Sequence, residues 1–167
     1  MPRQKITEQY ILDLIEKAKE KFYASPLFGE KIKNILREIR PCIILNSEMK
    51  EEWYATAGIE HSKSWEVVEY NLKEKMDYVM VEGRMSWYVI ELNSKLLKKS
   101  DKGSVYDTVS HELAHLLEMR LNGRYNRQDR RYHNACWKKI HRAMGGSGMA
   151  TDKGYEEWLS KNKSDNS

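Results

Sequence analysis

The feature that most constrains this chain is a five-residue stretch, His111-Glu112-Leu113-Ala114-His115, which has the pattern H-E-x-x-H. In an α-helix, residues four apart lie on the same face, so the two imidazoles can bind a single metal ion. Glu112 follows the first histidine directly and can reach a water molecule on the open side of that metal, where a carboxylate acts as a general base. The pattern is typical of the metal-binding helix of zinc metallopeptidases.

The residues around this motif predict an amphipathic helix of about 18 residues. Apolar side chains recur at helical spacing at Val109, Leu113, Leu116, Leu117 and Leu121. Ser104 is a good N-cap, and Asp107 in the first turn suits the helix dipole. Gly123 suits the end of the helix. The motif therefore falls inside a helix, where its chemistry requires it.

A catalytic zinc site usually has three protein ligands and one open position, so we expect a third ligand elsewhere in the chain. The metzincin extension, with Gly at position 118 and His at position 121, is excluded because the chain has Glu118 and Leu121 there. The other histidines are His61, His133 and His141. We favour His133, 18 residues after His115, because it directly precedes a second helical pattern and can fold back onto the first helix.

Other side chains remain candidates for the third ligand. His141 lies on the flank of the second apolar stripe, and we interpret it as a surface histidine among basic residues. Glu118, Glu156 and Glu157 are alternative carboxylate ligands, although Glu118 is only three residues past His115, which makes it a poor ligand for the same ion. Ligand histidines usually donate their second N–H to an acceptor. Asp107, Glu118 and Asp129 are candidates for that role, with solvated surface acids as the simpler interpretation.

Three stretches of the sequence resemble the SprT-like metallopeptidases, the group that includes the Spartan DNA–protein crosslink proteases. They are His111–Leu117, Val89–Leu97, and His133–Gly146, which is similar to the family's His-Gly-x-x-Phe/Trp motif and the short helix after it. With the order of elements, the resemblance spans residues 5–146. It implies a zincin-like minimal metalloprotease core in which His111, His115 and His133 bind zinc and Glu112 is the general base. The position after the third histidine is usually Gly in the family and is Asn134 here, a residue that also tolerates a left-handed backbone.

Length and composition limit the other possibilities. We predict one domain, residues 1–150, followed by a polar tail, residues 151–167, with Lys161–Ser167 disordered. The chain has no apolar run of 18 residues and no apolar N-terminal signal, so we expect neither membrane insertion nor secretion. Cys42 and Cys136 are far apart and form no C-x-x-C pair, which argues against a disulfide framework or a zinc ribbon and favours a reducing compartment. We expect a cytoplasmic monomer, and the lack of accessory domains fits a bacterial or phage protein.

The net charge of +4 conceals a basic segment between residues 120 and 142. Its eight basic residues are Arg120, Arg124, Arg127, Arg130, Arg131, Lys138, Lys139 and Arg142, and its one acid is Asp129, so the segment carries +7. Tyr125, Tyr132 and Trp137 are interleaved with these bases, although Trp137 suits a core position better. Basic side chains neutralise phosphates and aromatic rings stack on unpaired bases. We therefore predict contact with DNA, preferably single-stranded, with an ordinary solvated loop as the alternative.

The order of predicted elements gives an α+β fold with N-terminal helices, a small sheet of three or four strands, the H-E-x-x-H helix and a following C-terminal helix. The first two helices end at Ser25-Pro26 and before Pro41. The predicted strands are Cys42–Leu45, a hairpin of Trp65–Leu72 and Met76–Glu82, and Ser86–Leu92, while Trp53–Ile59 is ambiguous. We predict Ser86–Leu92 as an edge strand that binds a substrate backbone by strand addition.

Three functions compete at this point. The first is a zinc endopeptidase that acts on DNA-associated or DNA-crosslinked proteins. The second is a general regulatory protease without DNA dependence, whose basic segment recognises acidic protein. The third is a non-catalytic DNA-binding module with a structural metal, which the three-histidine set disfavours because structural zinc sites usually have four ligands and are rich in cysteine.

Overall fold

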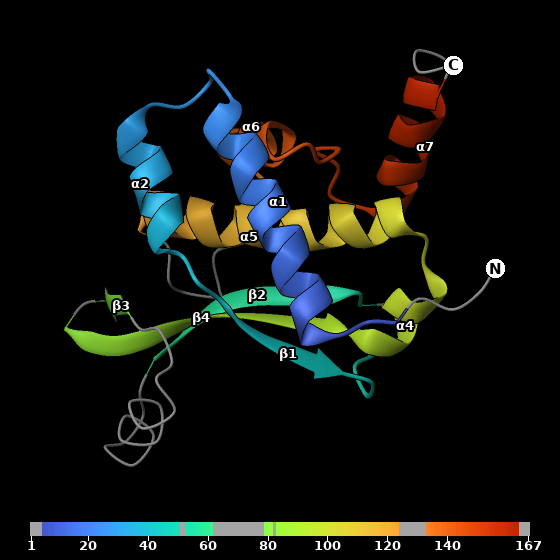
Figure 1. Ribbon diagram of the computed structural model, residues 1–167, viewed down its shortest axis with the longest axis horizontal. Helices are drawn as coiled ribbons and strands as arrows, with labels where there is room; N and C mark the ends of the chain where they lie inside the picture. Colours follow the sequence, from blue (N-terminus) through green and yellow to red (C-terminus); the bar gives the residue numbers. More distant parts are fainter. Residues whose placement is uncertain (1–4, 51–52, 62–78, 82, 124–132, 164–167) are drawn as a thin grey trace.

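The computed structural model describes residues 5–50, 53–61, 79–81, 83–123 and 133–163, and its fold is α+β, as predicted (Figure 1). The helices are α1 (Glu8–Ala24), α2 (Glu30–Glu38), α4 (Ser94–Lys99), α5 (Lys102–Asn122), α6 (Ala135–Ala143) and α7 (Asp152–Lys163). The strands are β1 (Cys42–Asn46), β2 (Ala55–His61), β3 (Val79–Val81) and β4 (Arg84–Asn93).

β4 is the central strand of the sheet. It pairs in parallel with β1 and antiparallel with β2, where Ala55 lies opposite Leu92, and the short β3 pairs with its first residues. The prediction that Ser86–Leu92 is an edge strand is therefore wrong. The near-continuous apolar run of this strand suits a position covered on both faces, and Trp87 and Ile90, which point to opposite faces, are both buried.

Helices α1, α2 and α5 lie on one side of the sheet (Figure 1). The apolar side chains of α1 recur at helical spacing and are buried: Ile11, Ile15, Ala18 and Phe22. The Thr7 side chain accepts a hydrogen bond from the Tyr10 backbone N–H at 3.1 Å and caps the helix, which ends at Ser25. The sequence-based prediction of this helix is confirmed.

α5 is the most buried helix, because the sheet, α1 and α6 pack around it. Its fully buried apolar side chains include Val105, Val109, Leu113, Leu116 and Leu117. A helix enclosed in this way is apolar on most of its circumference, so the polar groups that it does bury must have partners.

In the part of the chain that the structure describes, none of the helices has both the length and the apolar character that a membrane span requires.

The remaining predicted elements have mixed outcomes. The strand Cys42–Leu45 is confirmed as β1, and the ambiguous stretch Trp53–Ile59 contains the start of β2. The predicted hairpin lies outside the described residues except for β3. Residues of the predicted polar tail form α7, and residues 164–167 lie outside the described part of the chain.

Candidate metal centre

The H-E-x-x-H motif lies in the middle of α5, as predicted. The helix begins earlier than expected: Asp101 is the N-cap, and its Oδ1 accepts a hydrogen bond from the Ser104 backbone N–H at 2.8 Å, so Ser104 is inside the first turn. Gly123 ends the helix in the left-handed conformation, with φ 64°, which confirms its predicted role.

Three histidine side chains converge at this point of the fold. Nε2 of His115 lies 3.1 Å from Nε2 of His111 and 3.2 Å from Nε2 of His133, and the last two atoms are 3.1 Å apart. Three nitrogens bound to one zinc ion at about 2.05 Å in tetrahedral geometry would lie about 3.3 Å apart. The three side chains therefore fit a single metal ion and leave one coordination position open, so they form the group placed to hold a metal.

Loss of hydration favours the neutral imidazoles of His111 and His133, and the neutral ring is the form that binds a cation. Burial lowers the pKa of His111 to about 2, with smaller contributions from the neighbouring histidines. Burial also lowers the pKa of His133, and the nearby Lys138 ammonium lowers it further. A protonated imidazole has no free lone pair, so both shifts favour metal binding near neutral pH.

Glu112 lies beside this triad with its carboxylate almost out of contact with solvent. Its relative exposure is 6%, and Oε1 is 4.0 Å from His111 Nε2. Loss of hydration raises the pKa of Glu112 to about 8. The group can therefore carry a proton at neutral pH or release it to a neighbouring cation, as a general acid or base must.

Trp137 of α6 forms one wall around the histidines. Its ring centroid lies 4.6 Å from those of His111 and His133, and its ring stacks on His115 at 5.2 Å. The indole Nε1 donates a hydrogen bond to the backbone carbonyl of His111 at 3.2 Å. The side chain is fully buried, which confirms its predicted place in the core.

His141 is fully buried, so its interpretation as a surface histidine is wrong. Its Nδ1 accepts a hydrogen bond from the Gly148 backbone N–H at 3.0 Å, so the ring proton is on Nε2, which lies 2.9 Å from Ser110 Oγ. Burial lowers the pKa of His141 to about 4 and keeps the ring neutral. Both ring nitrogens are thus engaged away from the triad. The sequence periodicity does not predict this, because the contacts come from Ser110 of α5 and from the loop after α6.

Asp107 fixes the same loop from the side of α5. Its Oδ1 accepts a hydrogen bond from the Ser147 backbone N–H at 2.8 Å, and its Oδ2 accepts one from Ser147 Oγ at 3.0 Å. Two residues further on, the Met149 backbone carbonyl is hydrogen-bonded to the His111 ring and raises its pKa. Such a bond fixes the tautomer that directs the other ring nitrogen to a metal. Asp107 is therefore not a solvated surface acid.

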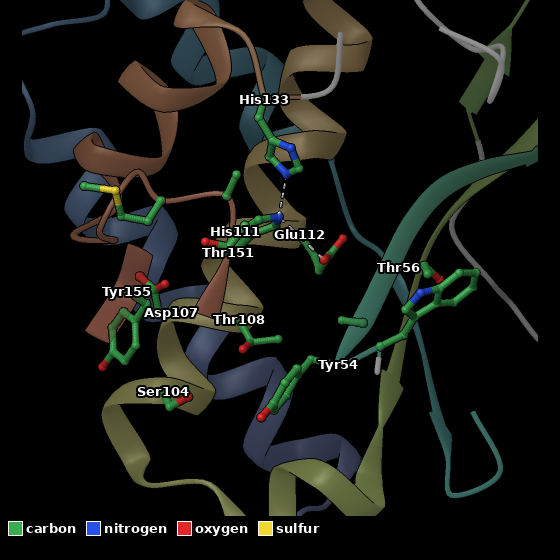
Figure 2. Close-up of a pocket in the computed structure, with 14 residues that line it drawn as sticks. Tyr54, Thr56, Ser104, Asp107, Thr108, His111, Glu112, His133, Thr151 and Tyr155 are labelled. Carbon is green, nitrogen blue, oxygen red and sulfur yellow. Dashed lines mark hydrogen bonds and ion pairs between the residues drawn. The ribbon is translucent and has the colours of Figure 1, made fainter. Parts of the chain in front are cut away.

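The triad opens into a pocket of about 690 Å³ (Figure 2). One wall is the start of β2, the floor is α5, and the other wall is the segment that leads into α7. The lining residues are Trp53, Tyr54, Ala55, Thr56, Ser104, Asp107, Thr108, His111, Glu112, His133, Met149, Ala150, Thr151 and Tyr155. Figure 2 shows His133, His111 and Glu112 at one end of the pocket and Ser104 at the other. Sequence reasoning missed the two walls, because no local pattern marks them.

The other candidate ligands lie elsewhere. Glu118 is buried and hydrogen-bonded to Asn122 and Asn134, and Glu156 and Glu157 are exposed on α7. Of the predicted DNA-binding residues, Lys138, Lys139 and Arg142 are exposed on α6, and Arg120 on α5 is partly buried. The other four are Arg124, Arg127, Arg130 and Arg131, which lie outside the described residues.

The fold and site describe a small α+β domain with three histidines arranged to hold one metal ion at the end of a pocket. The SprT-like family matches residues 32–156, which is most of the chain, and the chain belongs to this family. The matched region contains the whole triad, Glu112 and both walls of the pocket. Comparison with curated proteins and with solved structures gave no match.

Proposed function

We propose that this protein is a zinc-dependent endopeptidase in which His111, His115 and His133 bind the metal and Glu112 is the general base. The observation that carries this proposal is the convergence of three imidazole nitrogens beside a buried carboxylate, at the end of an open pocket. A structural zinc site is usually closed by a fourth protein ligand. Among the described residues, no fourth ligand joins the group.

The chemistry of the site divides between the metal and the protein. A bound zinc ion would act as a Lewis acid that acidifies water and polarises the scissile carbonyl. Glu112 takes the proton from the attacking water and delivers it to the leaving amine. Its buried environment suits this shuttle, because the desolvated carboxylate already holds protons more strongly than an exposed glutamate. The Met149 carbonyl keeps the His111 ring in the tautomer that leaves Nε2 free.

Substrate binding falls to β2 rather than to β4. The Asn93 backbone N–H donates to the Tyr54 carbonyl at 2.8 Å, so Tyr54 directs its backbone polar groups toward β4. Backbone direction alternates along an antiparallel strand, which leaves the groups of Ala55 and Ala57 pointing away from β4. Among the described strands, β2 pairs with β4 alone. We propose that an extended substrate adds to this edge, with its scissile bond beside Glu112.

Glu112→Gln tests the catalytic proposal. The variant keeps the size of the side chain but cannot accept the proton, so we expect wild-type zinc content and loss of peptide hydrolysis by at least a hundredfold. Glu156→Gln, a change at an exposed glutamate on α7, is the matched control and should retain full activity. Full activity of Glu112→Gln would refute this mechanism.

We further propose that the substrates are DNA-associated or DNA-crosslinked proteins. The support is the exposed basic face of α6, with Lys138, Lys139 and Arg142 only a few residues after His133. We expect salt-dependent binding of single-stranded DNA, and a triple alanine variant of these bases should show a shallower slope of log affinity against log salt. An unchanged slope would remove the α6 bases from the interface. No binding by the wild type would favour a regulatory protease that acts without DNA.

A further inference from the structure

Glu118 is a fully buried carboxylate on α5, the helix that carries two of the three histidines. Its Oε1 accepts hydrogen bonds from Asn122 Nδ2 at 3.0 Å and from Asn134 Nδ2 at 2.5 Å. A buried carboxylate is costly without such donors, and charge-assisted bonds of this length are among the stronger ones in proteins. The shorter of the two bonds connects α5 to the start of α6.

Asn134 uses both ends of its side-chain amide. Its Oδ1 accepts a hydrogen bond from the Trp137 backbone N–H at 2.9 Å and caps α6, while its Nδ2 donates to Glu118. Because one end must accept and the other must donate, the amide has one orientation that satisfies both contacts. The backbone at Asn134 is extended, with φ −75° and ψ 178°. The tolerance of Asn for a left-handed backbone is therefore not the reason for this residue.

Asn134 directly follows His133, the one histidine of the triad that α5 does not carry. The His133 ring is held at 4.6 Å from Trp137, and its Nε2 lies 3.1 and 3.2 Å from the other two ligand nitrogens. The Cα atoms of consecutive residues are a fixed distance apart, so the contact that holds Asn134 against α5 also restricts the position of His133. A glycine at this position would provide neither the cap nor the bond to Glu118.

We propose that the Glu118–Asn134 pair is the positioning device for the third metal ligand, an inference that rests on the proposed metal site. The hydrogen bond of the pair joins the start of α6 to α5, so it fixes His133 relative to the helix that carries His111 and His115. Glu118 is thus a positioning residue rather than a ligand.

An exchange of donor and acceptor tests this proposal. Asn134→Asp keeps the capping oxygen but places a second carboxylate against Glu118, and we expect zinc affinity to fall about ten- to a hundredfold. Adding Glu118→Gln restores a donor–acceptor pair with the roles reversed and the same net charge as the wild type. The double variant should recover zinc affinity to within about threefold of the wild type. Asn122→Ser is the matched control, because it removes a bond to the same oxygen without touching α6, and its affinity should be unchanged.

Zinc affinity is measured by competition with a chromophoric chelator, alongside the visible spectrum of the cobalt-substituted protein and urea unfolding of the metal-free protein. A positioning role predicts an altered cobalt spectrum and weaker zinc binding in Asn134→Asp, both reversed in the double variant. Lower metal-free stability with wild-type zinc affinity and cobalt spectrum would show a purely structural role and overturn the proposal. Failure of the double variant to recover would also overturn it. If the wild type binds no zinc, the proposed function itself fails, whereas unchanged affinity in Asn134→Asp refutes only the positioning role.

Discussion

Glu112→Gln should stabilise the metal-free protein, and more so as the pH rises. Burial raises the pKa of Glu112 from 4.5 to about 8. Between these two values the folded state keeps the proton and the unfolded state has lost it, so wild-type stability falls by about 1.4 kcal/mol per pH unit. The full penalty above pH 8 is roughly 5 kcal/mol. A glutamine at this position is neutral at every pH, so the variant does not have this stability penalty.

Urea unfolding of metal-free wild type and Glu112→Gln at pH 5 and pH 9 measures this difference. We expect the stability advantage of the variant to be about 4 kcal/mol larger at pH 9 than at pH 5. Glu156→Gln is the control, because it makes the same substitution at an exposed side chain. Zinc should reduce the difference, since a nearby cation stabilises the charged carboxylate. A difference that is constant with pH would refute the assignment of a raised pKa to Glu112.

Three further predictions follow from the contacts around the triad. Asp107→Ala removes both acceptors of Ser147 and should lower the free energy of unfolding in urea by roughly 3 kcal/mol. Zinc binding should also weaken, because the loop that contains Ser147 and Met149 is released. Wild-type zinc affinity would show that this loop does not orient His111. Trp137→Phe loses the bond to the His111 carbonyl and should cost about 1 kcal/mol by the same measurement, while a neutral effect would mean that this bond contributes nothing. Trp53→Ala, at a half-exposed side chain on the pocket wall, should raise KM for an unstructured protein substrate about threefold without lowering Tm, and an unchanged KM would place the substrate elsewhere.

The sequence predicts the parts of this fold that local patterns determine. The apolar spacing of α1, the strand at Cys42 and the left-handed stop at Gly123 each depend on a few neighbouring residues, and all three are confirmed. The H-E-x-x-H spacing likewise places His111 and His115 on one helix face. His133 lies beside them as expected, and its role as a ligand stays a prediction.

The errors concern contacts between distant segments. The position of β4 within the sheet depends on pairing with β1 and β2, which the apolar run of Ser86–Leu92 does not determine by itself. His141 looks like a surface residue because Lys138, Lys139 and Arg142 lie near it in the sequence, and Asp107 looks like a solvated acid near the start of a helix. Both have a partner in the loop after α6, which no local pattern places beside them. The sequence identifies Glu118 only as a poor ligand, because its partner Asn134 lies 16 residues away.

The most direct test of the metal centre is elemental analysis of the purified wild type beside His133→Ala. The three-histidine site predicts one zinc ion per wild-type chain and loss or strong weakening of binding in the variant. No metal in the wild type, or full zinc content in His133→Ala, would contradict it.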